Sequence, residues 1–105
     1  MTESTDRKFG NFADFYPYYL SEHANRTCRR LHFAGSTCAL ACLATFAATG
    51  RPGWLMAAIV SGYAFAWVGH FFFEKNRPAT FKYPFYSLAG DWVMYWQTLT
   101  GRIRF

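Results

Sequence analysis

The sequence predicts an all-α integral membrane protein: a transmembrane helical hairpin with an amphipathic interfacial helix before it and another after it. Three observations lead to this fold class. The 105 residues contain two long charge-free runs, a short turn rich in proline and glycine joins these runs, and only 16% of the residues are charged. Soluble domains usually carry about 25% charged residues. A chain of this length forms one domain, residues 1–105.

Composition also narrows the class of partner. Hydrophobic residues reach 52% and aromatic residues 22%, which argues against a disordered chain or a coiled coil. The mean hydropathy of −0.04 resembles that of a soluble protein only because polar ends offset the apolar runs. The net charge of +5 indicates an anionic partner. The basic residues flank the runs and match no nucleic-acid module, so we expect membrane lipids as partners and no nucleic acid.

The N-terminal part contains one expected helix. Residues 1–11 should form a flexible polar N-terminus, and residues 12–24 an amphipathic helix that Pro17 starts or kinks. Its apolar residues recur at helical spacing, namely Phe12, Phe15, Tyr16, Tyr19 and Leu20.

Residues 31–49 and 53–73 form the two predicted spans. As helices they would be about 28 and 31 Å long, close to a hydrocarbon core of about 30 Å. The compact turn Gly50-Arg51-Pro52-Gly53 joins them. The alternative is two buried helices of a soluble bundle, but 105 residues cannot wrap two helices that are apolar all round.

Residues 84–99 should form an amphipathic or re-entrant helix. Pro84 stands near its start, Gly101 follows its end, and apolar residues recur at steps of three and four between them. Asp91 in the middle and several Trp and Tyr residues favour a helix lying in the membrane interface.

Flanking charges predict the orientation of the hairpin. Three arginines precede the first span and three basic residues follow the second, whereas the turn carries only Arg51. By the positive-inside rule both termini are cytoplasmic. The membrane would be the inner membrane in a bacterium and the endoplasmic reticulum in a eukaryote. No cleavable signal peptide is visible, so the first span would direct insertion.

Two histidines are expected at one depth of the hairpin. His32 lies 19.5 residues before the midpoint between Arg51 and Pro52, and His70 lies 18.5 residues after it. Each histidine also ends a stripe of small residues, the kind of surface on which membrane helices approach closely. The stripes are Gly35, Ala39 and Cys42 in the first span and Ala58, Gly62 and Ala66 in the second.

A metal site is the more specific interpretation of histidines at one depth. His70 and Glu74 share a helical face, and His23 lies where the N-terminal helix meets the first span. Two histidines and a carboxylate are the ligand set of non-haem Fe(II) oxygenases, and the set also suits Zn(II). The ordinary alternative is a hydrogen-bonding interfacial histidine and a solvated Glu74. The pattern alone therefore indicates a metal site without fixing the metal.

Several stretches together resemble a known family. They are FYPYYLSEHAN (15–25), LHFAG (31–35), GHFFFEKNRPATF (69–81), Tyr83-Pro84 and Gly90-Asp91. They resemble the small membrane family, formerly a domain of unknown function, whose fungal member is an endoplasmic-reticulum 2-hydroxy-fatty-acid dioxygenase. The resemblance covers about residues 12–103, and the GHFFFEKNRPATF run is its most specific part.

The resemblance implies a function and a set of site residues. The family's enzyme resembles an Fe(II)-dependent dioxygenase of α-oxidation, which uses O₂ to shorten a 2-hydroxy fatty acid by one carbon. Its essential histidines correspond to His23, His32 and His70. On this hypothesis these three bind Fe(II), and Glu74 is a fourth metal ligand or supports one. These four are the expected catalytic residues.

Further expectations concern the surroundings of the metal. Asn25, Asn76 and Asp91 are expected to support the ligands. The substrate carboxylate should pair with one of four arginines, which are Arg26, Arg29, Arg30 and Arg77. Two spans make a thin scaffold, so we expect a homodimer that packs through Ala41, Ala44 and Ala48.

Two other functions remain open at this point. One is a non-catalytic small membrane protein that binds lipid or a partner protein. The other is a haem protein with His32 and His70 as the two axial ligands.

Overall fold

The computed structural model describes residues 9–105, which form four α-helices and no strand. The predicted all-α fold with a helical hairpin is confirmed. Residues 1–8 of the expected N-terminus lie outside the described residues. In chain order the elements are α2 (Phe12–Ser21), α3 (Arg26–Thr49), α4 (Pro52–Val68), the π-helical turn η1 (Gly69–Glu74), the 3-10 turn η2 (Ala79–Phe81) and α5 (Pro84–Leu99).

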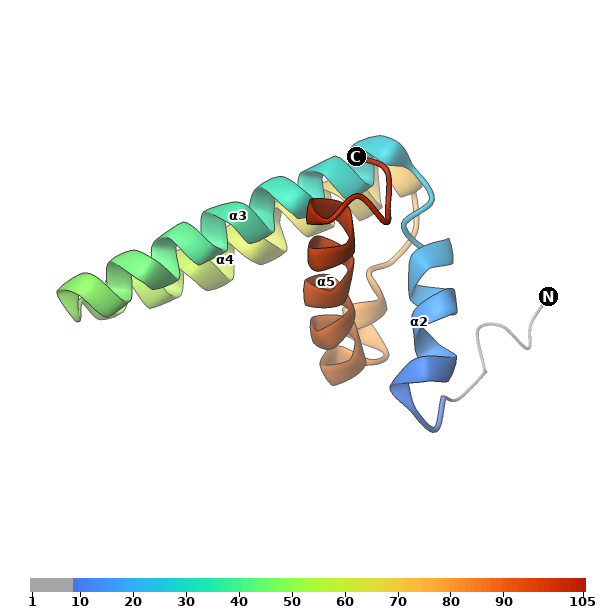
Figure 1. Cartoon of the computed structure of the whole chain (residues 1–105), viewed down its shortest axis with the longest axis horizontal. Helices are drawn as coiled ribbons and strands as arrows, with labels where there is room; N and C mark the ends of the chain where they lie inside the picture. Colours follow the sequence, from blue (N-terminus) through green and yellow to red (C-terminus); the bar gives the residue numbers. More distant parts are fainter. Residues whose placement is uncertain (1–8) are drawn as a thin grey trace.

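Helices α3 and α4 form the long hairpin, which lies along the 48 Å longest dimension of the molecule (Figure 1). Gly50 ends α3 in the left-handed region with φ of 70°, and Pro52 occupies the first turn of α4. Glycine tolerates this φ and proline lacks the N–H that a helix start leaves unpaired. Helix α3 starts before the expected residue 31, because the Asn25 side chain caps it by accepting the Cys28 N–H at 3.1 Å.

Glycines bring the two arms of the hairpin together. A Cβ atom on Gly35 would lie 2.7 Å from Cβ of Phe65 and 3.1 Å from the carbonyl oxygen of Ser61. A Cβ atom on Gly69 would lie 2.9 Å from Sγ of Cys28. Both positions therefore need glycine for the close contact. The small-residue stripes predicted the contact at Gly35, whereas Gly69 belongs to neither stripe.

The hairpin presents apolar side chains to its surroundings. Only 17% of the most apolar window of Arg26–Thr49 and 22% of that of Pro52–Glu74 are buried. Met56 is 63% exposed and Val60 is 57% exposed. Core helices of a soluble bundle are mostly buried, so the exposed apolar surface disfavours that alternative. By length and composition, both segments could cross a membrane.

Helices α2 and α5 pack side by side at the open end of the hairpin, where the described ends of the chain also lie (Figure 1). Phe15, Tyr19 and Met94 are buried between them. Helix α5 turns its small residues inward, because the Tyr19 ring would contact a Cβ atom on Gly90 at 3.0 Å. Its predicted apolar stripe faces outward, as an interfacial helix requires, with four strongly exposed members: Phe85, Leu88, Trp96 and Leu99.

Candidate metal centre

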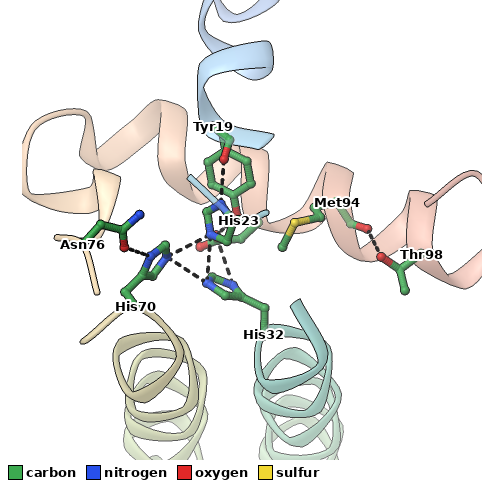
Figure 2. A network of polar contacts seen from close by, with 8 residues as sticks. Tyr19, His23, His32, His70, Asn76, Met94 and Thr98 are labelled. Carbon is green, nitrogen blue, oxygen red and sulfur yellow. Dashed lines mark hydrogen bonds and ion pairs between the residues drawn. The ribbon is translucent and has the colours of Figure 1, made fainter. Parts of the chain in front are cut away.

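Three histidines from three parts of the chain meet at the open end of the hairpin (Figure 2). His23 lies between α2 and α3, His32 lies on α3, and His70 lies in η1. The Nε2–Nε2 distances are 3.0 Å for His23–His32, 3.3 Å for His32–His70 and 2.9 Å for His23–His70. All three side chains are buried. The Nε2 atoms thus face one common point inside the protein.

Two of the histidines have a hydrogen-bond acceptor at the other ring nitrogen, and the third faces a carboxylate there. Nδ1 of His23 lies 2.7 Å from the carbonyl oxygen of Tyr19, and Nδ1 of His70 lies 2.7 Å from Oδ1 of Asn76. Nδ1 of His32 faces a carboxylate oxygen of Asp91 at 3.7 Å. A carbonyl oxygen can only accept, so Nδ1 donates in His23 and His70. Their neutral rings then carry lone pairs on Nε2.

This arrangement of lone pairs fits a metal ion. A hydrogen on Nε2 of His32 could form a hydrogen bond with only one of the other two Nε2 atoms. The remaining close nitrogen–nitrogen contacts would then have no hydrogen between them. Buried acceptors without donors are costly, and a cation would satisfy all three. At metal–nitrogen distances of about 2.0–2.1 Å, neighbouring ligands lie about 2.9–3.4 Å apart, which matches the observed separations. Two axial haem ligands would lie about 4 Å apart, so the geometry disfavours the haem alternative.

The electrostatics of His23 favour its role as a ligand. Burial, reinforced by the neighbouring His70 ring, lowers the pKa of His23 to about 3. The ring is therefore neutral at physiological pH, and metals bind the neutral imidazole.

A local irregularity of the backbone positions His70. The helix widens into the π-turn η1, and Lys75 then adopts a left-handed conformation with φ of 60°. This reversal lets the Asn76 backbone N–H bond the carbonyl oxygen of His70 at 3.0 Å. The Asn76 side chain consequently lies against Nδ1 of His70 (Figure 2). Single π-turns inside helices are frequent at functional sites.

Tyr19 and Asp91 connect the centre to α2 and α5. The Tyr19 hydroxyl donates to the Asp91 carboxylate, and the Tyr19 ring stacks on His23 with centroids 4.1 Å apart. Burial raises the pKa of Asp91 to about 7, although the bond from Tyr19 opposes this shift. Burial and the nearby Asp91 charge raise the pKa of Tyr19 well above its usual value. Tyr19 therefore stays protonated and keeps donating to Asp91.

A family model described as 2-hydroxy-palmitic acid dioxygenase Mpo1-like matches residues 9–103. The chain belongs to the Mpo1-like family. The match confirms the predicted family. The family's description implies a dioxygenase that acts on a 2-hydroxy fatty acid. Comparisons with curated proteins and with solved structures gave no significant match.

In this Mpo1-like chain, Glu74 lies beside the histidine group. The group of metal-ligating side chains that the described residues bring together consists of His23, His32 and His70. The Glu74 carboxylate accepts the backbone N–H of Asn25. Glu74 and Asn25 thus both form hydrogen bonds at the start of α3. The role of Glu74 as a fourth metal ligand, or as a support for one, stays a prediction.

The four predicted arginines lie in different surroundings. Arg26 and Arg30 each donate Nε to the main-chain oxygen of Phe105 at 3.0 Å. Arg77 is exposed in the connector after η1. Arg29 lines a pocket together with His32 and Asp91, and its buried Nε has no hydrogen-bond partner within the described residues. Its Nη1 donates to the main-chain oxygens of His23 and Ala24, so Arg29 is the one of the four that lies beside the histidines.

Two spaces adjoin the histidines. A pocket of about 10 Å³ is lined by all three histidines and by Ser87, and about 10–15 Å³ is room for one water-sized molecule. The Ser87 side chain is 1% exposed, and its hydroxyl has no hydrogen-bond partner within the described residues. A second, apolar groove of about 160 Å³ begins at His32 and Asp91 and follows the hairpin.

Sequence reasoning did not single out Ser87 or assign Tyr19 to the site. Nothing in the sequence distinguishes a site serine from any other serine of an amphipathic helix. The helical spacing assigns Tyr19 to the apolar face of its helix, which is correct for the buried ring but does not indicate the bond that its hydroxyl donates to Asp91. Both roles depend on how α2 and α5 cross the hairpin.

Proposed function

We propose that this protein is an Fe(II)-dependent dioxygenase that shortens 2-hydroxy fatty acids by one carbon, an α-oxidation at the membrane interface. The observation that supports this most is the convergence of three buried Nε2 atoms within 3.3 Å of one another. The family's description supplies the reaction class. Imidazole ligands suit both iron and zinc. Because Zn²⁺ has no redox chemistry, a dioxygenase favours iron.

The chain's own residues would prepare this chemistry in three ways. Bound iron would supply the redox reaction with O₂ that protein side chains lack. The carbonyl oxygen of Tyr19 and the Asn76 side chain hold two imidazoles in the ligating tautomer, and Asp91 faces the third. Burial keeps water away from the centre. Arg29 would bind the substrate carboxylate, because a guanidinium matches a carboxylate with two parallel donors.

The location we propose suits an amphiphilic substrate. Helices α3 and α4 with η1 would cross the membrane, and both termini would be cytoplasmic, in the inner membrane of a bacterium or the endoplasmic reticulum of a eukaryote. The histidines lie at the end of the hairpin where basic residues gather. A fatty acid whose head group stays at the interface could therefore reach them.

The expected homodimer remains a prediction. Ala41, Ala44 and Ala48 are exposed on α3, as such a contact requires. Cross-linking in mild detergent that yields monomer alone would contradict it.

The decisive experiment combines metal analysis with turnover. Protein purified without oxygen should contain about one iron per chain. It should consume O₂ with 2-hydroxypalmitic acid and release the acid that is one carbon shorter. His32→Ala and His70→Ala should lose iron and turnover, whereas Cys38→Ala, at an exposed position of α3, should keep both.

Each alternative gives a different result. A metal-free preparation whose histidine variants behave normally would indicate a non-catalytic membrane protein. A Soret band would indicate haem. Stoichiometric zinc without oxygen consumption would exclude the dioxygenase.

A further inference from the structure

An apolar groove runs from the histidine centre along the hairpin. It lies between α3 and α4, and α5 lines it beside the centre with Leu88 and Trp92. His32 and Asp91 form its polar end, and Leu43 and Leu55 belong to its far part. His32, Asp91 and Tyr63 also line the small pocket that contains all three histidines. The groove and the candidate metal centre are therefore continuous.

Small residues keep this groove open, and Gly62 is the smallest of them. A Cβ atom on Gly62 would meet only Cβ of Ala39, at 4.0 Å, which is ordinary contact. The contrast with Gly35 is sharp, since a Cβ atom there would lie 2.7 Å from Phe65. Helix packing therefore requires glycine at position 35 and leaves room for a side chain at position 62. The space beside Gly62 belongs to the groove.

We propose that this groove holds the acyl chain of the substrate and that Gly62 determines how long a chain can enter. This inference rests on the proposed function for its substrate. The groove has the two-part chemistry of a fatty acid, with a polar end at the metal ligands and an apolar remainder. Its far part lies among exposed apolar side chains such as Ile59, so the distal end of a long chain can continue into lipid.

The position of Gly62 sets a length scale. It faces Ala39, which is seven residues beyond His32 in α3 and so about 10 Å along the helix axis. A C–C bond of about 1.5 Å advances an extended chain by about 1.3 Å per carbon, so Gly62 is reached after about eight carbons. The volume of about 160 Å³ is close to that of a cavity of about 150 Å³ that binds benzene. The groove thus encloses only the first part of a long chain.

Photolabelling tests occupancy without relying on turnover. Full-length, iron-loaded protein in phosphatidylcholine vesicles is mixed without oxygen with a 2-hydroxy fatty acid that carries a diazirine near its eighth carbon. Cross-links should map to buried groove residues, Ala39 and Ala58. Gly62→Leu should lower this labelling at least fivefold. Val60→Leu is the matched control, because Val60 faces outward, and its labelling should equal that of the unaltered protein.

Two labelling results would overturn the proposal. One is cross-linking that stays on outward-facing Met56 and Val60 in every protein. The other is groove labelling that excess phosphatidylcholine removes as readily as unlabelled 2-hydroxypalmitic acid does, because a structural lipid would then occupy the groove. Circular dichroism and iron content should be unchanged in Gly62→Leu, which separates a filled groove from a misfolded hairpin.

Turnover provides the second measurement. Gly62→Leu should lower kcat/KM for 2-hydroxypalmitic acid at least tenfold and change that for an eight-carbon 2-hydroxy acid less than twofold. Equal losses for both substrates would contradict a length-selecting role. If the unaltered protein labels in the groove and never consumes O₂, the proposed function fails and the groove assignment stands. If it consumes O₂ and labels only on its outer face, the proposed function stands and the groove assignment fails.

Discussion

Replacing Asn76 by alanine tests whether the three histidines are oriented for a metal. Oδ1 of Asn76 lies 2.7 Å from Nδ1 of His70, and its Nδ2 donates to the main-chain oxygen of Glu22 at 3.1 Å. This second bond fixes which end of the amide faces His70. Asn76→Ala removes the acceptor and leaves the Nε2 ligand atom in place. The ring can then rotate or exchange tautomers, and both changes weaken a metal–nitrogen bond.

The expected magnitude follows from that lost bond. Removing the group that orients a ligating histidine typically lowers metal affinity 10- to 100-fold. At about 1.4 kcal/mol for each tenfold change, this is about 1.4–2.8 kcal/mol of binding free energy. His70→Ala, which removes the ligand itself, should lower the affinity much further. The two variants therefore separate orientation from ligation.

The assay is anaerobic competition for Fe(II) between the protein and a chelator of known affinity. Asn11→Ala is the matched control, since Asn11 accepts the Asp14 N–H at 2.8 Å at the start of α2, away from the centre. Loss of this cap should lower stability by about 1 kcal/mol and leave the Fe(II) affinity unchanged. An Asn76→Ala affinity within twofold of the unaltered protein, beside a strong effect of His70→Ala, would refute the orientation argument.

Three further predictions follow from packing, an unpaired hydroxyl and a tyrosine. Gly35→Ala should destabilise the hairpin in detergent denaturation by about 1–3 kcal/mol, because its Cβ would clash with Phe65, whereas Gly62→Ala should be neutral or stabilising. Ser87→Ala should leave the melting temperature unchanged or higher, because it removes a buried hydroxyl that has no hydrogen-bond partner within the described residues. A lower rate of O₂ consumption in the same variant would show that a ligand uses that hydroxyl. Burial raises the pKa of Tyr16 to about 12, above its unfolded value of about 10, so its contribution to stability is lost as pH rises from about 10 to 12. Unfolding measured across this range should be less pH-dependent in Tyr16→Phe.

The hairpin could be predicted because its cause is local. Two charge-free runs with Gly50 and Pro52 between them leave few folds for a short chain. Counting outward from the turn then placed His32 and His70 at one depth, and the structure puts their Nε2 atoms 3.3 Å apart. This step works because antiparallel helices have the same rise per residue.

The surroundings of the three histidines could not be predicted in the same way. Whether Asp91 faces His32 depends on the angle at which α5 crosses the hairpin. The spacing of apolar residues in the sequence does not determine this angle. The apolar stripe of α5 fits the expected interfacial helix, but its spacing does not show that Ser87, Gly90 and Met94 are the residues that pack inward. Likewise, Gly35 and Gly62 both belong to small-residue stripes. Their different roles, helix contact and groove, appear only once the distances to neighbouring atoms are known.

The distribution of the three histidines has a thermodynamic consequence. His32 and His70 are brought together by the hairpin itself, but His23 joins them only when α2 and α5 pack across its open end. Without a cation the three facing nitrogens work against that packing. A metal that binds all three would stabilise the folded state by about 4 kcal/mol at a thousandfold excess over its Kd. Removal of the metal should therefore loosen the α2 end of the molecule before the hairpin, and hydrogen exchange should rise first in Phe12–Ser21. The centre would then be both the reactive site and the link that holds this end of the chain in place.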